Sequence, residues 1–199
     1  MKDLQAIVSK FAIQGTLQEI KPLGAGLIND TYKVTTQEPE MPNYVLQRIN
    51  HAIFQDVDML QANIDAVTTH IRKKLEEQQA TDIDRKVLHF LPTAEGKTYW
   101  YDGESYWRVM VFIPNAKTYE TVNPEFSYYA GVAFGNFQAM LADIPAQLGE
   151  TIPNFHNMEF RLQQLRDAVA ADPAGRVAEV KEYLDELEKR AEEMCKAAR

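Results

Sequence analysis

Cysteine is almost absent from this sequence, and the shortage limits the chemistry that the chain can carry. Cys195 is the single cysteine among 199 residues, which excludes a disulfide within the chain and a cluster of thiolate metal ligands. Such sparing use of cysteine is typical of a reducing compartment. We interpret Cys195 as an inert residue on a terminal helix.

Long apolar runs are also missing. No apolar run approaches the roughly 20 residues that a membrane-spanning helix needs. The first residues, MKDLQAIVSKFAIQG, lack the apolar core and the small-residue cleavage site of a signal peptide. The sequence therefore predicts a cytoplasmic protein that has no contact with a membrane.

Positive charge and histidine are both scarce. The chain carries 21 Lys and Arg against 29 Asp and Glu, a net charge of −8, and its basic residues are not clustered. Nucleic-acid binding requires a concentrated basic surface, so we expect no nucleic-acid partner. The four histidines are far apart and lack the spacing of metal ligands, so we predict no metal site within the chain.

The first part of the chain has the patterns of an antiparallel sheet with one long helix. A short helix is predicted at residues 3–11, followed by strands at 16–23, 29–36 and 44–49. Gly24 and Gly26 fall between the first two strands and indicate a hairpin turn. Apolar residues then recur at helical spacing from Leu60 to Leu75, which predicts a helix over residues 56–78.

The remaining chain changes from strands to helices. Strands are expected at residues 86–91, 97–101 and 106–113, and helices at 124–143, 158–171 and 175–196. We predict an α+β fold with a boundary at this change, so that residues 1–113 and 114–199 form separate parts.

Two segments of the first part each allow two interpretations. The glycine-containing segment from Gly24 to Thr31 is either a plain hairpin turn or a turn whose backbone amides hold phosphate oxygens. The strand at 44–49 carries Gln47 and Arg48, whose side chains must lie on opposite faces. Arg48 is either a surface residue or a cation that binds the phosphates of a nucleotide.

The order of these features resembles the small lobe of a protein-kinase-like fold. The stretches GAGLINDTYKV, YVLQRINHAIF and MLQANIDAVTTHIRKK, followed by YWRVMVFIPNAKTYE, FGNFQAMLADIP and IPNFHNMEFRLQQL, are similar to the N-acetylhexosamine kinases of the aminoglycoside-phosphotransferase superfamily. The resemblance covers nearly the whole chain. It implies an ATP-binding small lobe at residues 1–113 and the helical start of a large lobe at 114–199.

The resemblance assigns roles around the phosphates of ATP. The segment from Gly24 to Thr31 would lie over the phosphates, with the backbone amides of Gly26 and Leu27 as donors and side-chain bonds from Asn29 or Thr31. Arg48 would take the role of the strand lysine, and Gln47 is the competing assignment because the register is open by one residue.

Adenine would be bound at the other end of the same sheet. The resemblance implies that Phe112, Ile113 and Pro114 form a hinge whose backbone reads the adenine edge. Val45 or Val111 would line the ring.

The activity implied by the resemblance is phosphorylation of a small hydroxylated metabolite with ATP and Mg²⁺. The favoured acceptor is the anomeric hydroxyl of an N-acetylhexosamine, and homoserine, choline and aminoglycosides remain open. His156 and Arg161 would line the substrate cleft from the large-lobe side. Ordinary surface positions at a helix start explain these two residues equally well.

The sequence departs from the kinase pattern at two points. The helix expected at 56–78 has no glutamate between Ile53 and Leu75 to pair with a strand cation. After Ile113 there is no His-x-Asp followed by Asn, and no later Asp in a metal-binding turn. We therefore identify no catalytic residue and expect that the chain by itself does not turn over, with the Mg²⁺ ligands beyond it.

Truncation of a working sugar kinase is the interpretation that we prefer for this second departure. A non-catalytic module that binds a nucleotide or a protein partner is the alternative. If the large lobe is incomplete, apolar surface is exposed, and homo-oligomerisation is one way to bury it.

Overall fold

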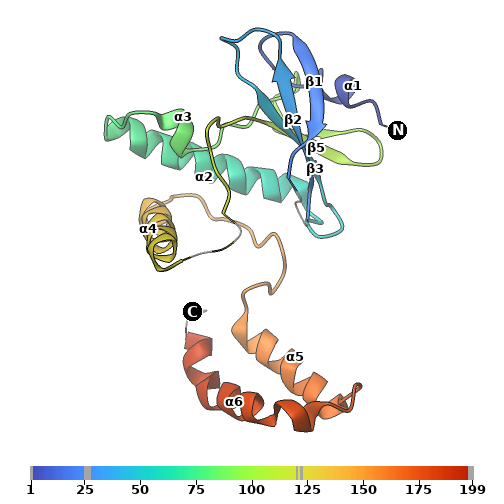
Figure 1. Cartoon of the computed structure of the whole chain (residues 1–199), viewed down its shortest axis with the longest axis vertical. Helices are drawn as coiled ribbons and strands as arrows, with labels where there is room; N and C mark the ends of the chain where they lie inside the picture. The colour runs from blue at the N-terminus through green and yellow to red at the C-terminus, as the bar shows by residue number, and fades with distance from the viewer. Residues whose placement is uncertain (1, 25–27, 120, 122, 197–199) are drawn as a thin grey trace. The chain divides into compact units, whose positions relative to one another are not determined.

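The computed structural model describes residues 2–24, 28–119, 121 and 123–196 (Figure 1). The chain divides into two compact units, Met1–Thr151 and Ile152–Arg199. The first unit contains the sheet and its covering helices, and the second is a helical hairpin.

A five-stranded antiparallel sheet forms the centre of the first unit. Its strands are β1 (Leu17–Pro22), β2 (Asp30–Thr36), β3 (Tyr44–Ile49), β4 (Trp100–Tyr101) and β5 (Tyr106–Val111), in the spatial order β1-β2-β3-β5-β4. Each pair is antiparallel, and β3 lies at the centre, between β2 and β5. The start of β2, which follows the first glycine-containing segment, therefore lies beside the central strand.

Strand alternation gives the sheet two faces with different coverings. On one face, here called the α1 face, Leu46, Val109 and Trp107 are buried with residues of the short helix α1 (Leu4–Val8). On the opposite face, the α2 face, Ile49 packs against Leu60 of the long helix α2 (Val57–Glu77). Figure 1 shows α2 crossing beneath the sheet. The two faces bury separate apolar clusters, which fixes the register of the strands.

The strand predicted at residues 86–91 is wrong. Residues Ile83–Lys86 form the helical turn α3 instead, and only a single bridge, Phe90 to Met110, joins this segment to β5. Pro92 follows at once and has no N–H to extend the ladder. The strand predicted at 97–101 is shortened to Trp100–Tyr101.

Helix α4 (Pro124–Leu141) lies against α2 in the first unit. Polar contacts join the two helices at the carboxyl-terminal end of α4. Lys74 on α2 donates to the carbonyl of Met140 at 2.9 Å and also binds the carboxylate of Asp143. His70 Nε2 lies 3.1 Å from the same carbonyl. Large side chains of α4 are exposed elsewhere, among them Tyr128, Tyr129, Val132, Phe134 and Phe137.

The second unit contains α5 (Met158–Ala171), the 3₁₀ turn η1 (Val177–Val180) and α6 (Lys181–Lys196). A two-point ion pair joins the helices, in which Arg166 Nε and Nη2 lie 2.8 and 2.7 Å from the carboxylate oxygens of Glu188. The helix predicted at residues 175–196 is thus divided in the structure, since the 3₁₀ turn η1 precedes the α-helix α6. Across the described ranges, no helix combines the length and the apolar character needed to cross a membrane.

The predicted α+β class is confirmed by the antiparallel sheet and its helices. The predicted order of three strands, a long helix, further strands and then helices is also present, with five strands in place of six. The predicted boundary after Ile113 differs from the division into compact units, because α4 belongs to the first unit. Whether Ile113 marks a lobe boundary stays a prediction.

Asp102 fastens the amino terminus to the edge of the sheet. Its carboxylate accepts hydrogen bonds from Lys2 Nζ at 2.6 Å, from Trp107 Nε1 at 2.9 Å and from the amides of Glu104 and Ser105 at 2.9 and 2.7 Å. Burial opposes ionisation, but these four donors outweigh it and hold the pKa of Asp102 well below its usual range.

Replacement of Asp102 by Asn is expected to lower the free energy of unfolding by about 2 kcal/mol near pH 7, because hydrogen bonds to a charged acceptor are lost. The depressed pKa means that the carboxylate stabilises the fold above its unfolded pKa of about 3.9, and that this contribution decreases as the pH falls toward the folded pKa. Urea unfolding at several pH values measures both effects. Glu104→Gln is the matched control, since Glu104 is exposed and lies 3.5 Å from Lys2; an equal loss in both variants would contradict the assignment.

Candidate functional site

A row of polar side chains crosses the α2 face on three neighbouring strands. Thr31 on β2 is the register partner of Gln47 on β3, and Gln47 is the partner of Arg108 on β5. The amide nitrogen of Gln47 donates to the hydroxyl of Thr31 at 3.1 Å, and the amide oxygen accepts from Arg108 Nε at 3.0 Å. Cross-strand register thus brings together three residues that are far apart in the sequence.

The row continues into α2. Arg108 Nη1 donates to the side-chain oxygen of Gln61 at 3.1 Å, and the amide nitrogen of Gln61 donates to Thr98. The hydroxyl of Thr98 donates to Asp65 at 3.0 Å. These six residues, here called the Arg108 network, join three strands to the long helix: Thr31, Gln47, Gln61, Asp65, Thr98 and Arg108. Gln61 is buried within it.

The electrostatics of the network are unusual for a half-buried arginine. Burial lowers the pKa of Arg108 to about 10, so the guanidinium still carries its charge near neutral pH. Within the described ranges, no carboxylate forms an ion pair with it, and its hydrogen-bond acceptors are the neutral amides of Gln47 and Gln61. The ring of Phe90 lies 5.4 Å from the guanidinium carbon. The site therefore holds a positive charge that no carboxylate of the described residues pairs with.

Arg48 lies on the other face of the sheet. It pairs in register with Asp30 and Trp107, and its Nε and Nη2 lie 2.6 and 2.5 Å from the carboxylate of Asp30. About 43 % of the Arg48 side chain is exposed. Of the two residues considered for the role of the strand lysine, Gln47 is the one whose side chain lies on the α2 face.

The glycine turn is described in part. Gly24 has a φ of +72°, a backbone conformation that favours glycine. Asn29 accepts a hydrogen bond from the amide of Asn50 at 2.9 Å, which ties the end of the turn to the end of β3. Gly26 and Leu27, the predicted amide donors to phosphate, lie outside the described residues. Their role stays a prediction.

The residues predicted to surround adenine divide between the two faces. Val45 lies on the α2 face beside Lys33 in the register, and the ammonium of Lys33 is 4.6 Å from the centre of the Phe112 ring. Val111 and Ile113 instead line a hollow of about 240 Å³ that also includes Tyr44. Val45 and Phe112 thus share Lys33 as a neighbour, whereas Val111 and Ile113 line the hollow.

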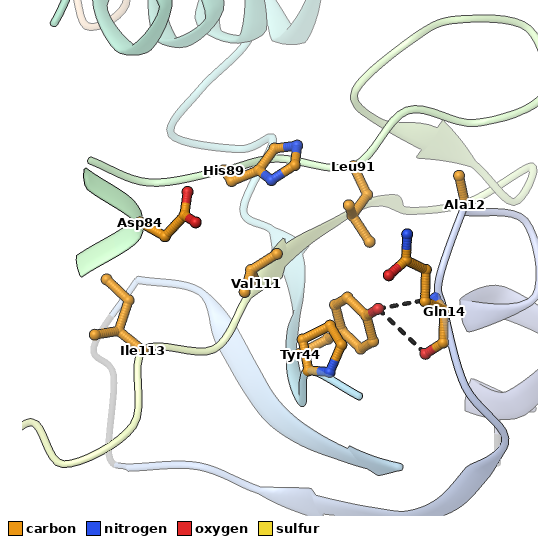
Figure 2. A pocket seen from close by; sticks show the side chains of 9 residues that line it. Ala12, Gln14, Tyr44, Asp84, His89, Leu91, Val111 and Ile113 are labelled. Carbon is orange, nitrogen blue, oxygen red and sulfur yellow. Dashed lines mark hydrogen bonds between the residues drawn. The ribbon is translucent and has the colours of Figure 1, made fainter. Parts of the chain in front are cut away.

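This hollow on the α1 face is mainly apolar. Figure 2 shows Val111, Ile113 and Leu91 around it, with the hydroxyl of Tyr44 bonded to the backbone of Gln14. The amide of Gln14 donates to that hydroxyl at 2.8 Å, and the hydroxyl donates to the Gln14 carbonyl at 3.2 Å. The hydroxyl of Tyr44 thus ties β3 to the backbone of Gln14, which precedes β1.

His156 and Arg161 lie in the second unit. Arg161 donates to the carbonyl of Phe155 at 3.3 Å and to Gln164 at 2.9 Å, and the ring of His156 contacts the ring of Phe155 at a centroid distance of 4.5 Å. These contacts are local to the start of α5. The predicted substrate role of both residues stays a prediction.

Side chains that could bind a metal ion are dispersed over the described part of the chain. Among the residues that the structure describes, no three or more His, Cys, Asp or Glu side chains gather in a way that could hold a metal ion. We assign no ligand to Mg²⁺ and derive no step through it.

Comparison with known proteins identifies the family. The chain belongs to the phosphotransferase enzyme family, whose profile matches residues 19–199. Among solved structures it is similar to spectinomycin phosphotransferase APH(9)-Ia in complex with ADP and spectinomycin, with 12 % identity and a TM-score of 0.49. That similarity covers 97 % of this chain and 59 % of the other, so the chain spans less than two thirds of the length of this relative.

Four residues of the Arg108 network were missed by the sequence analysis: Gln61, Asp65, Thr98 and Arg108. Arg108 is a charged residue inside an otherwise apolar strand, YWRVMV, and such an interruption is a signal for a functional or paired charge. Gln61 follows directly after Leu60 and faces the sheet, where a kinase helix carries glutamate. Neither signal gives the pairing, because that depends on the register of β3 and β5.

Replacement of Asp65 by Asn is expected to raise the free energy of unfolding near pH 7, by up to about 1 kcal/mol. Burial raises the pKa of Asp65, so its ionised form weakens the fold as the pH rises from the unfolded pKa through the folded one. Asn keeps an oxygen for Thr98 without the charge. The gain should vanish at about pH 2.5, where Asp is protonated in both the folded and the unfolded chain; urea unfolding at pH 7 and at the acid pH measures it.

Asp58→Asn on the same helix is the matched control. A hydrogen bond from Tyr99 at 2.6 Å lowers the pKa of Asp58, so loss of this charge should weaken the fold near pH 7. A change of the same sign in both variants would contradict the assigned difference between the two aspartates.

Proposed function

We propose that this chain is the nucleotide-binding part of an ATP-dependent kinase that phosphorylates a small molecule. The observation that carries the proposal is the match of the phosphotransferase enzyme family over residues 19–199. It is supported by the α2 face, where a guanidinium without an ion-pair partner among the described residues lies on β5, separated only by β3 from the residues that follow the glycine turn. A partly enclosed cation of this kind is suited to phosphate.

Position on the α2 face is our ground for proposing some of the predicted residues as nucleotide contacts. Asn29 and Thr31 lie at the end of the glycine turn, and Val45 and Phe112 lie farther along the same face. We propose that the phosphates lie toward the turn and that adenine lies toward Phe112. Gly24, Gly26 and Leu27 complete the proposed phosphate side.

For the acceptor, we propose a small hydroxylated metabolite and would test N-acetylhexosamines first. This choice rests on the resemblance of the stretches GAGLINDTYKV and YVLQRINHAIF to N-acetylhexosamine kinases. The structure of APH(9)-Ia contains spectinomycin, and we would therefore screen spectinomycin as the second acceptor. His156 and Arg161 remain proposed acceptor contacts.

Catalysis requires a group that accepts the proton of the acceptor hydroxyl. The sequence after Ile113 contains no His-x-Asp followed by Asn, and we assign no base among the residues of this chain. We propose that the 199 residues bind nucleotide without transferring its phosphate at a measurable rate. A non-catalytic nucleotide-binding module is the second candidate function that this observation favours.

ATP and ADP are each expected to stabilise the chain against thermal unfolding. A ligand at about a hundred times its Kd adds about 2.7 kcal/mol to the free energy of unfolding, because it binds the folded state only. Differential scanning fluorimetry over a concentration series gives the apparent Kd, with adenosine and inorganic phosphate as comparison ligands. Absence of any stabilisation by ATP, ADP or adenosine would overturn the nucleotide-binding proposal.

The same protein can be tested for transfer with N-acetylglucosamine, N-acetylgalactosamine and spectinomycin as acceptors, using phosphorus NMR to follow the sugar phosphate. Nucleotide binding without product is the expected result. Product formation would confirm the kinase activity and overturn our proposal that this chain alone is inactive.

A further inference from the structure

We propose that Arg108, held between Gln47 and Gln61, is the cation that binds the phosphate groups of the nucleotide. The inference rests on the proposed function and adds to it a residue on β5 that the kinase pattern does not predict. It assigns positioning roles to Gln47 on β3 and to Gln61 on α2.

The first step of the argument is the hydrogen-bonding capacity of Arg108. A guanidinium has five N–H donors, and within the described ranges Arg108 uses one for Gln47 and one for Gln61. Three donors are left for a ligand. No buried side-chain nitrogen or oxygen among the described residues is without a partner, so Nη2, which bonds neither glutamine, is not sealed inside the fold.

The second step is charge. Buried arginines are normally compensated by a carboxylate, because a lone buried charge is costly. Within the described part of the chain, Arg108 has only neutral amide acceptors, whereas Arg48 is paired with Asp30 at 2.5 Å. A phosphate group would supply the missing negative charge in a planar, two-point geometry that suits arginine.

The third step is position. Arg108 is the register partner of Gln47, which in turn is the partner of Thr31. Thr31 follows Asn29 and Asp30 at the carboxyl end of the glycine turn, and its hydroxyl belongs to the same hydrogen-bonded row. A phosphate chain lying beneath that turn is therefore on the face and in the row that Arg108 occupies.

The two glutamines explain how the cation is held without being neutralised. A glutamate at position 61 would bind the guanidinium strongly and compete with phosphate for it. Gln61 orients Nη1 at 3.1 Å as a neutral acceptor, and Gln47 does the same for Nε at 3.0 Å. This one arrangement accounts both for the lack of a glutamate between Ile53 and Leu75 and for the lack of a lysine on β3.

The test compares Arg108→Gln, Arg108→Lys, Arg48→Gln and wild type by calorimetric titration with ADP, AMP and adenosine. Arg72→Gln serves as the control for loss of a positive charge from the same unit, because Arg72 is paired with the exposed Asp84 at 2.9 Å. Near-UV circular dichroism of each variant reports the packing of Trp107, which is buried on the same strand as Arg108.

Arg108→Gln is expected to weaken ADP binding by about ten- to a hundredfold, the effect of losing charged hydrogen bonds. Adenosine binding should stay unchanged, and the loss should be smaller for AMP than for ADP. Arg48→Gln and Arg72→Gln should bind ADP as wild type does. Arg108→Lys keeps the charge without the planar fork and is expected to fall between wild type and Arg108→Gln.

The outcomes separate this inference from the function on which it rests. If wild type binds no nucleotide, the proposed function fails first. If wild type binds ADP and Arg108→Gln binds it equally well, the inference is overturned, and a loss confined to Arg48→Gln would assign the role to β3. Where Arg108→Gln loses the near-UV signal of Trp107, the folded Arg108→Lys decides, and unchanged ADP affinity in it overturns the inference.

Discussion

A half-buried guanidinium that pairs with no carboxylate of the described residues is the constraint around which the first unit is arranged. Desolvation lowers the pKa of Arg108 to about 10 but does not remove the charge, so the surrounding structure has to orient neutral dipoles toward it. Gln47 supplies one and Gln61 the other. Since these residues come from β3 and α2, the position of the long helix is tied to the position of the charge.

This coupling gives the packing of α2 a meaning beyond covering the sheet. The apolar packing of Ile49 against Leu60 sets the distance between α2 and the sheet. The hydrogen bond from Arg108 to Gln61 sets the rotation of α2 about its own axis. A shift of α2 along its axis would leave Gln61, a buried side chain, without its partners. The free-energy cost of a buried amide without a partner opposes such a shift. The carboxyl-terminal end of α2 is held separately, because Lys74 on α2 donates to the carbonyl of Met140 on α4.

The sequence was sufficient for the class of fold and for most of its elements. Apolar spacing located α2 to within one residue at each end, because a long periodic stripe leaves little freedom. It failed at residues 86–91, where a helical turn and Pro92 leave too few extended residues for a strand. The apolar pattern of a segment does not show whether a neighbouring strand is available to pair with all of its residues; here only Phe90 forms a bridge, to Met110 on β5.

The site was harder to predict than the fold, for a reason visible in β3. Gln47 and Arg48 are neighbours, and one residue of uncertainty in register moves a side chain to the opposite face. A basic residue draws attention in a sequence, yet Arg48 faces Asp30 while the neutral Gln47 faces the network. Arg108 entered the site only through pairing with a strand some sixty residues earlier, since the two positions are 61 apart.

Helix α4 has a consequence for how the chain behaves as a solute. Its 18 residues include a single charged side chain, Glu125, and aromatic rings such as Tyr128 and Phe134 are exposed. A net charge of −8 makes two copies repel each other, but this repulsion is screened within about 8 Å at physiological ionic strength. Adding salt removes the repulsion and leaves the attraction between rings, so ionic strength governs whether the chain stays dispersed.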